Sequence, residues 1–314
     1  MADGPLVTVI GEALIDLVAD DTGAYLARPG GSPYNVAVGL ARLGIRTSLM
    51  ARLSDNAFGR QLRRHAEACG IELSAAPRAV EPTTLAVVSL DDSGQAAYDF
   101  YLLGTADWQW TAAETAGLPA GTAVLHFGSI ASWTAPGSDR IHALARGARA
   151  GGAVLVSYDP NIRPLLLGDP ARARDLVERD VAIAQLVKAS SEDVGWLYPD
   201  ADVDQVADSW LRLGAELVVV TDGADGATAY RSGAEALHRP GRPTRVVDTV
   251  GAGDAFTSGL LTAVVERSLH TPGRLANLTD EDVAGLLDTA VLVSSLTCER
   301  VGADPPTAAE RAAG

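Results

Sequence analysis

The sequence predicts an α/β fold in which a mainly parallel sheet carries helices on both faces. Short apolar runs alternate with longer amphipathic runs along most of the chain, and this alternation is typical of strand–helix–strand units. Glycines follow several of the amphipathic runs, where a left-handed helix end is easily adopted only by glycine. Two stretches, 13–29 and 84–103, instead contain consecutive strand patterns, which predict a small antiparallel β flap beside the main sheet.

The expected strands of the main sheet are short apolar runs, as strands buried on both faces require. In chain order they are Leu6 to Ile10, Arg46 to Leu49, Ala123 to Phe127, Ala153 to Tyr158, Leu186 to Ala189 and Glu216 to Thr221. The expected helices between them are Tyr34 to Leu43, Ala57 to Ala68, Asp139 to Ala150, Pro170 to Ala184, Glu192 to Tyr198 and Asp204 to Leu213. The glycines just past four of these helices are Gly44, Gly70, Gly151 and Gly214. The last residues, 305–314, are small and polar, and we expect them to fray.

The two flap segments contain turn-forming residues at 20–23 and at 91–94. A flap beside an α/β sheet usually acts as a lid over a ligand, and an insertion without such a role is the alternative. We therefore expect a single α/β domain over residues 1–314, with a lid formed by approximately 13–29 and 84–103.

The composition excludes several classes of function. The net charge is −15, and clustered Lys and Arg of the kind that hold nucleic-acid backbones are not seen. We attribute the acidity to a well-solvated surface, and a cell with high internal salt is the alternative. The two cysteines, Cys69 and Cys298, lack metal-ligand spacing. The chain has no basic leader followed by a long apolar run, and no apolar stretch approaches the ~20 residues that span a bilayer. We expect a cytoplasmic protein without nucleic-acid or membrane partners.

The strongest motif is the segment 248–254, Asp-Thr-Val-Gly-Ala-Gly-Asp, which directly precedes an expected helix. Small residues before a helix leave backbone N–H groups bare, and these groups form an anion site suited to a transferring phosphoryl group. We expect the amides of Gly251, Ala252 and Gly253 to hold that group. Asp254 lies beside them in the first helical turn, where its carboxylate can accept the proton of an attacking hydroxyl. A simple helix cap is the alternative role for Asp254.

A second glycine-rich segment, 30–37, reads Gly-Gly-Ser-Pro-Tyr-Asn-Val-Ala. Together the two segments resemble the N-terminal and C-terminal signatures of the ribokinase-like carbohydrate kinases, the PfkB family, and the resemblance spans essentially the whole chain. It implies a ribokinase-like fold and an enzyme that transfers phosphate from ATP to a hydroxyl of a small sugar, with Asp254 as the catalytic base. The chain has neither a P-loop sequence nor the glycine fingerprint of dinucleotide-binding dehydrogenases.

Several residues are candidates for sugar binding. Gly30 and Gly31 let the backbone approach a ligand closely, and Asn35 offers a donor and an acceptor to neighbouring hydroxyls. The resemblance implies that Asp16 accepts hydrogen bonds from the sugar. An aromatic residue of the flap, Phe100, could stack on a sugar face, although such residues are more often part of a core.

The segment 159–163, Asp-Pro-Asn-Ile-Arg, directly follows an expected buried strand, at the sheet edge where α/β folds bind ligands. It resembles the Asp-x-Asn-x-Arg of the fructokinase-like branch, which adds Asp159, Asn161 and Arg163 to the substrate-binding candidates. Arg163 could neutralise phosphate charge, or it could form a structural salt bridge.

The resemblance also implies where the nucleotide and its metal ions bind. Thr221, Gly223 and Gly226 match a Thr-x-Gly-x-x-Gly that lies against the nucleotide in the family, and a plain turn is the alternative. The sequence Ser-Ser-Glu-Asp at 190–193 stands where many relatives carry Asn-x-x-Glu. Glu192 and Asp193 are therefore candidates for water-mediated contact with the Mg²⁺ that bridges the ATP phosphates.

A monovalent cation often lies beside the anion site in this family, held largely by backbone carbonyls. The matching positions are near Asp248 and Val250 and in the C-terminal loop 300–306. A proline in that loop stands where the ribose-specific branch has serine, which leaves potassium dependence open.

The sequence of the flap bears on which sugar is the substrate. The segment 98–107 resembles the Phe-Tyr-Arg stretch of fructokinases and ketodeoxygluconate kinases, but Leu102 replaces the usual arginine. An acidic sugar needs a cation for its carboxylate, so the loss of this arginine favours a neutral sugar, with fructose first. Arg163 could still pair such a carboxylate. The alternatives are a 2-keto-3-deoxygluconate kinase, a ribokinase, a nucleoside kinase, or a sugar sensor without catalysis. Exposed flap edges favour a homodimer.

Overall fold

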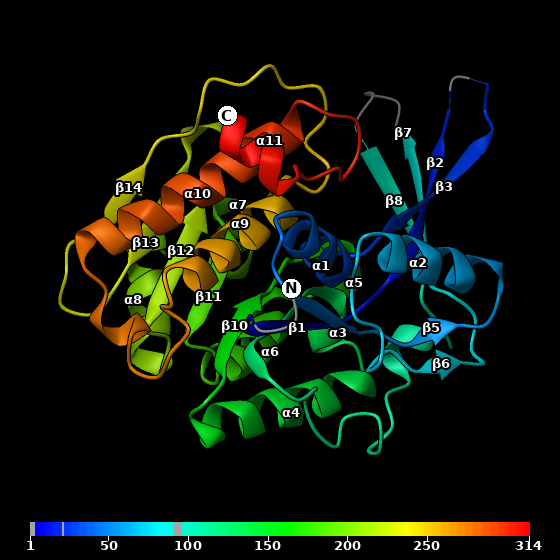
Figure 1. Cartoon of the computed structure of the whole chain (residues 1–314), viewed down its shortest axis with the longest axis horizontal. Coiled ribbons are helices and arrows are strands. Elements are labelled where there is room, and N and C mark those ends of the chain that lie inside the picture. Colours follow the sequence, from blue (N-terminus) through cyan, green and yellow to red (C-terminus); the bar gives the residue numbers. More distant parts are fainter. Residues whose placement is uncertain (1–3, 21, 91–95) are drawn as a thin grey trace.

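The computed structural model describes residues 4–20, 22–90 and 96–314. Its main sheet has the strand order β14-β13-β12-β11-β10-β9-β1-β4 (Figure 1). Neighbouring strands from β12 to β4 run parallel, and β13 and β14 extend the sheet antiparallel at one edge. The bounds of these strands are β1 (Leu6–Ile10), β4 (Thr47–Met50), β9 (Thr122–Gly128), β10 (Leu155–Asp159), β11 (Leu186–Ser190), β12 (Leu217–Thr221), β13 (Ala227–Tyr230) and β14 (Leu237–Arg239).

Helices cover both faces of this sheet because alternate strand residues point to opposite sides. In β10, Leu155 belongs to one hydrophobic cluster and Val156 to the other, and β11 and β12 divide in the same way. The first cluster includes residues of α1 (Ser32–Arg42), α2 (Ala57–Ala68), α9 (Ala252–Glu266) and α10 (Asp280–Cys298). The second includes residues of α3 (Ser129–Trp133), α4 (Gly137–Gly151), α6 (Pro170–Val181), α7 (Ser191–Leu197) and α8 (Val203–Leu213). The expected two-faced α/β architecture is confirmed.

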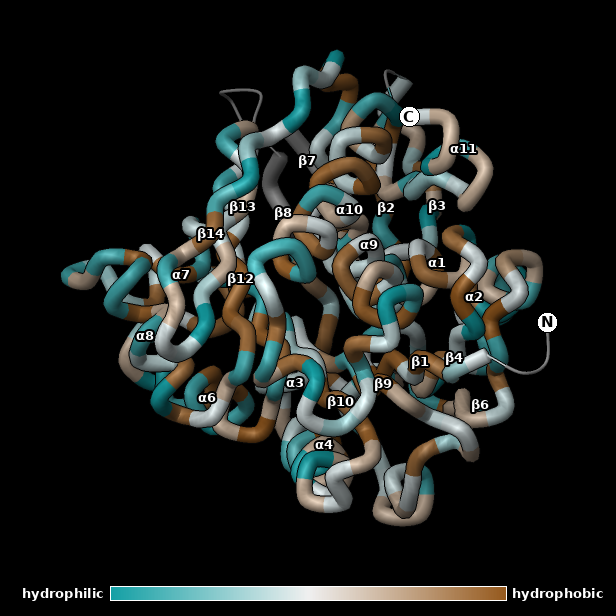
Figure 2. Tube along the Cα trace, turned by 60° about the vertical axis from the view of Figure 1, so that its left-hand side comes forward, coloured by the Kyte–Doolittle hydropathy of each residue, from teal (hydrophilic) through white to brown (hydrophobic). Residues whose placement is uncertain are grey.

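The hydropathy of the chain follows these layers. Figure 2 shows hydrophobic residues along the central strands β10 and β12 and along α9, whereas the outer helices α7 and α8 carry many hydrophilic residues. Shorter elements complete the fold: α5 (Pro164–Leu167), α11 (Ala308–Ala313), η1 (Ala106–Trp108), η2 (Gly223–Asp225), η3 (Leu275–Asn277) and the strand pair β5 (Leu53–Ser54) and β6 (Arg78–Ala79). No helix within the described ranges is long and apolar enough to cross a membrane.

The flap is a second sheet, with the strand order β3-β2-β7-β8, that rises beside the main sheet (Figure 1). Its strands are β2 (Leu14–Ala19), β3 (Tyr25–Gly30), β7 (Leu85–Leu90) and β8 (Ala96–Tyr101). The expected antiparallel hairpins β2/β3 and β7/β8 are present, and a parallel pairing of β2 with β7 joins them. The turn expected at 91–94, and residue 21 of the other turn, lie outside the described residues.

Two local expectations need correction. Gly151 is the last residue of α4, and the left-handed residue that ends this helix is Gly152, with φ 70°. The C-terminal segment is a helix, α11, which begins with a capping box between Thr307 and Glu310. An ion pair between Arg311 and Glu266 of α9, at 2.6 Å, ties this last helix to the core.

Candidate active site

The anion site lies where α9 begins. Gly251 adopts a left-handed conformation, with φ 75°, and a Cβ there would lie 2.5 Å from the Cβ of Ala303, so only glycine fits. Among the described residues, backbone acceptors are found for the amides of Ala252 and Ala255 but not for those of Gly251, Gly253 or Asp254. The N–H of Ala252 donates to the carbonyl of Thr249 at 3.1 Å, and its expected contact with the phosphoryl group stays a prediction.

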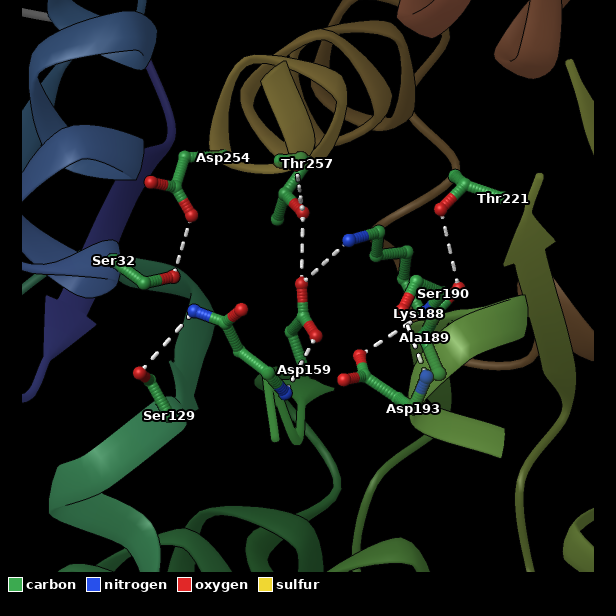
Figure 3. A network of polar contacts seen from close by, with 12 residues as sticks. Ser32, Ser129, Asp159, Lys188, Ala189, Ser190, Asp193, Thr221, Asp254 and Thr257 are labelled. Atoms are coloured by element: carbon green, nitrogen blue, oxygen red, sulfur yellow. Dashed lines mark hydrogen bonds and ion pairs between the residues drawn. The ribbon is translucent and has the colours of Figure 1, made fainter. Parts of the chain in front are cut away.

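Asp254 joins the two glycine-rich signatures. Ser32 Oγ donates to Asp254 Oδ1 at 2.6 Å (Figure 3). Asn35 Nδ2 donates to Oδ2 at 2.9 Å, and both donors lie in the first turn of α1. Desolvation raises the pKa of this carboxyl, and the hydrogen bonds from Ser32 and Asn35 oppose the increase. A carboxylate with a raised pKa beside bare amides is suited to accept a proton from a hydroxyl.

Asp16 and Gly30 lie on the paired flap strands β2 and β3. A Cβ on Gly30 would lie 2.1 Å from Asp16 Oδ2, so the carboxylate rests directly on the glycine backbone. Desolvation, followed by the charge of Asp254, raises the pKa of Asp16 to about 6, and the charge of Arg163 opposes this shift. Asp254 and Arg163 thus both lie close enough to Asp16 to affect its pKa.

Gly31 precedes α1 with φ 99°, and a Cβ there would lie 2.9 Å from the carbonyl oxygen of Glu12. The side chain of Glu12 is buried, and its Oε2 accepts the amide of Ala131 at 3.0 Å. Burial, with a smaller contribution from Asp107, raises the pKa of Glu12 to about 7. The sequence reasoning missed this carboxyl, which lies on the link between β1 and the lid.

Asp107 is a second buried carboxyl that the sequence reasoning missed. It accepts hydrogen bonds from the amide of Ala13, at the root of β2, and from the hydroxyl of Thr84, at the root of β7. Burial raises its pKa to about 6. One carboxyl group therefore holds the starts of both lid hairpins.

The segment after β10 is fixed by internal hydrogen bonds. Asp159 is buried, and its Oδ1 accepts the amide of Asn161 at 3.1 Å. The side chain of Asn161, a residue with φ 41°, donates to Ser129 Oγ at 3.3 Å and accepts from Arg163 Nη1 at 2.8 Å. Arg163 is thereby held with its charge near Asp16. Asp159 is engaged within the protein, and its expected part in substrate binding stays a prediction.

Lys188 is the central residue that the sequence reasoning missed. Its ammonium donates to Asp159 Oδ2 at 3.0 Å, and both side chains are buried (Figure 3). Thr257 of α9 donates to the same oxygen at 3.3 Å. A signal was present in the sequence, because Lys188 is the single lysine of the chain and stands within an otherwise apolar strand pattern.

The predicted nucleotide residues lie at the end of β12. Thr221 Oγ1 donates to the carbonyl of Ala189 at 3.4 Å (Figure 3). Gly223 and Gly226 both have positive φ, at 50° and 104°. A Cβ on Gly226 would lie 2.1 Å from the carbonyl oxygen of Arg239, whereas one on Gly223 would meet nothing within 4 Å. Gly226 is thus required by the fold, and the nucleotide contacts of all three residues stay predictions.

The residues proposed to bind metal have few side-chain oxygens that are free to contact an ion. Asp193 Oδ1 accepts the amide of Ile162 at 3.0 Å, and Oδ2 accepts that of Ser190 at 3.2 Å, as part of the capping box of α7. Glu192 is exposed beside it. Within the described ranges, no group of three His, Cys, Asp or Glu side chains is arranged to hold a metal ion. Asp193 therefore has a structural role, and a water-mediated magnesium contact stays a prediction.

The segment before the anion site pairs with the C-terminal loop. Asp248 Oδ2 accepts the amide of Gly302 at 2.7 Å, and Oδ1 accepts that of Val250 at 3.0 Å. The amide of Asp248 also donates to the carbonyl of Cys298 at 3.2 Å. The two segments named for a monovalent cation are thus in contact, as such a site would require.

Phe100 lies on β8, opposite Ala86 of β7, and is partly buried against the hydrophobic cluster that includes Trp108 and Ile130. Its expected contact with the sugar stays a prediction.

Comparison with known proteins identifies the family. A family model described as pfkB family carbohydrate kinase matches residues 5–310. The chain belongs to this family. A fructokinase of Klebsiella pneumoniae is 37% identical over 282 residues, which cover 88% of this chain and 89% of the relative. This chain is thus a carbohydrate kinase, which is a phosphotransferase with an alcohol group as acceptor.

Solved structures share the whole fold. The fructokinase of Xylella fastidiosa with bound ATP has a TM-score of 0.88 at 28% identity and covers 98% of this chain and 97% of its own. A double mutant of the Vibrio cholerae fructokinase, in a form with fructose, ADP and potassium ion bound, has a TM-score of 0.87 at 28% identity and covers 100% and 99%. The expected ribokinase-like architecture is confirmed.

Proposed function

We propose that the chain is a fructokinase that transfers the γ-phosphate of ATP to the primary hydroxyl of fructose. The observation that carries this proposal is the position of Asp254, whose carboxylate lies beside the free amides of the anion site and is held by Ser32 and Asn35. The fructokinase relatives and the solved fructokinases with ATP, or with fructose and ADP, support the choice of nucleotide and sugar.

The reaction follows from the arrangement of these groups. Asp254 accepts the proton of the attacking hydroxyl, and the amides of Gly251, Ala252 and Gly253 stabilise the charge on the transferred phosphoryl group. The lid strands close over the sugar and exclude water that would otherwise hydrolyse ATP.

On the sugar side, Asp16 and Asn35 accept and donate hydrogen bonds to the hydroxyls, while Gly30 and Gly31 let the backbone approach the ring. Arg163 faces the same space, held by Asn161.

On the nucleotide side, Thr221, Gly223 and Gly226 contact ATP. A bound Mg²⁺ would supply positive charge against the ATP phosphates. The exposed carboxylate of Glu192 fits a contact through water, the usual mode for an ion that keeps most of its hydration shell. The paired segments at Asp248 and Gly302 fit a potassium ion held by backbone carbonyls, and the potassium-bound Vibrio cholerae fructokinase supports this assignment.

A neutral sugar is favoured by the surroundings of Leu102. Its side chain packs partly buried against the hydrophobic cluster, and its carbonyl accepts hydrogen bonds from Thr105 Oγ1 at 2.8 Å and Trp108 Nε1 at 3.0 Å. The position that would supply a cation to an acidic sugar is thus filled by an apolar residue. Without such a cation, burying a substrate carboxylate is costly.

The proposal is tested by ADP release with ATP-Mg and fructose, ribose, 2-keto-3-deoxygluconate, glucose or adenosine as acceptor. Selective turnover of fructose is expected. Preference for 2-keto-3-deoxygluconate would refute the choice of sugar and point to Arg163 as its cation. Sugar binding without any ADP release would refute the kinase assignment and favour a sensor.

A homodimer formed through the lid is part of the proposal. Tyr25 on β3 and Tyr101 on β8 are 53% and 61% exposed at the two edges of the lid sheet. Apolar edge strands are normally covered. A monomeric mass in analytical ultracentrifugation at micromolar concentration would refute the dimer.

A further inference from the structure

The position of Lys188 is unusual for a lysine. It is buried in β11, a central strand of the main sheet, although lysine is among the residues that are least often fully buried. It is also the only lysine of the chain, which otherwise uses 24 arginines for its positive charges. A single lysine at a buried site indicates that the compact ammonium group, and not merely a positive charge, is needed there.

The ammonium of Lys188 lies directly against the backbone of the anion site. A Cβ on Gly253 would lie 3.3 Å from Lys188 Nζ, so a glycine at this position leaves room for the lysine. The amide of Gly253 is one of those without a backbone acceptor among the described residues. A positive charge and bare N–H groups therefore meet at the N-terminus of α9.

The surrounding charges hold Lys188 in its protonated form. Burial alone would lower the pKa of its ammonium, but the carboxylates of Asp159, Asp193 and Asp254 outweigh that effect and raise it. Three carboxyl groups thus lie around one lysine at the sheet edge where the ATP phosphates are proposed to bind. Without the lysine, this acidic edge would repel a triphosphate.

We propose that Lys188 is a positioning residue for phosphoryl transfer, which places a fixed positive charge behind Gly253 and is itself held by Asp159. This inference rests on the proposed ATP-dependent function. Lysine is a compact point charge suited to phosphate, and an arginine would need more space than the contact with Gly253 leaves. The ammonium neutralises charge on the transferred group without exchanging a proton with it.

A double variant separates this role from that of a structural ion pair. Lys188→Met alone leaves Asp159 buried without a partner, and a loss of stability is expected for that reason. Lys188→Met with Asp159→Asn removes both charges, and Asp159→Asn alone is the matched control because its side-chain oxygen can still accept from the lysine. If the pair is only structural, the double variant and the control have equal activity.

We expect the double variant to be as thermostable as the control but to have a kcat lower by ~10²-fold, the scale of a lost charge-stabilising group. The KM for sugar is expected to stay within about threefold, because the lysine acts on the phosphate side. ATP-Mg affinity, measured by calorimetry, is expected to fall by about tenfold or more. A double variant within threefold of the control in both kcat and ATP-Mg affinity overturns the proposal.

The single lysine also allows a test that needs no variant. Protein labelled with ¹⁵Nζ-lysine gives one side-chain NMR signal, and we expect ATP-Mg to shift it. An unchanged signal at saturating ATP-Mg overturns the proposal even where the double variant does not fold. Wild-type turnover on the sugar panel decides the proposed function separately, since the shift and the affinity do not depend on the acceptor.

Discussion

The replacement of Asp254 by Asn tests the catalytic base with the smallest change of shape. In the wild type, Ser32 and Asn35 both donate to the carboxylate, at 2.6 and 2.9 Å. An asparagine amide has one acceptor and one donor group, so one of the two donors then faces an N–H. The hydroxyl of Ser32 can rotate to accept, which keeps the cost in folding free energy near the lower end of about 1–3 kcal/mol.

The catalytic loss is expected to be much larger than the loss of stability. A general base contributes ~10²–10⁴-fold to the rate, which corresponds to about 3–5 kcal/mol of activation free energy. The assay is ADP release at saturating ATP-Mg and fructose, with fructose affinity measured separately by calorimetry. We expect nearly unchanged fructose binding, and turnover by Asp254→Asn within tenfold of the wild type would refute the assignment.

Ser32→Ala is the matched control, because it removes one hydrogen bond and leaves the base. We expect its turnover at pH 8 to stay within about tenfold of the wild type. Desolvation raises the pKa of Asp254, and the bond from Ser32 opposes this shift. The base must be ionised, so activity falls as the pH falls through its pKa, and the control moves that fall to higher pH. An unchanged pH profile would show that Asp254 does not govern it.

Two further predictions concern the lid and its link to the core. Gly30→Ala is expected to raise the KM for fructose by about tenfold or more with an unchanged KM for ATP, because the added methyl group would lie 2.1 Å from Asp16 Oδ2. Gly117→Ala is the control, with nothing within 4 Å of its Cβ, and equal KM values for both variants would contradict the placement of Asp16. Burial raises the pKa of Glu12 from 4.5 to about 7, so the folded protein holds this proton more tightly than the unfolded chain does. The resulting contribution to the free energy of unfolding is fully present below about pH 4.5 and is lost as the pH rises through 7. Glu12→Gln should remove this loss of about 3 kcal/mol, seen as a smaller fall in melting temperature between pH 5 and pH 8, and parallel curves for both proteins would contradict it.

The sequence predicted the elements whose signals are local. Apolar runs and capping glycines placed six parallel strands and the helices α1, α2, α4, α6, α7 and α8 to within a few residues, and the consecutive strand patterns identified both flap hairpins. The edge strands β13 and β14 and the long helix α10 were not predicted. The parallel pairing of β2 with β7 was not predicted, because no local pattern specifies which distant strands meet. The helix at the C-terminus was missed although its signal was present: Thr307 and Glu310 have the spacing of a capping box.

The site was predictable where a sequence motif is typical of a known chemistry. It was not predictable where backbone torsion angles determine which groups are free to bind. The motif 248–254 indicated an anion site, but the turn that commits the amide of Ala252 to Thr249 depends on the left-handed conformation at Gly251. The partners of Lys188 were hidden for another reason. It contacts Asp159 of the neighbouring strand β10 and lies against Gly253 of α9, a helix far along the chain, so only the assembled fold reveals its position.

The assembled fold also changes the reading of the segment 159–163. The sequence offered Asp159 and Asn161 as substrate contacts, and in the structure the side chain of each also holds a cation. Asp159 holds Lys188 behind the anion site, and Asn161 holds Arg163 near the sugar-side carboxylate Asp16. Phosphoryl transfer redistributes negative charge on the transferred group while the nucleophile loses a proton, so fixed positive charges near the site stabilise the transition state. This short segment, fixed by its own hydrogen bonds, sets both positive charges in relation to the base.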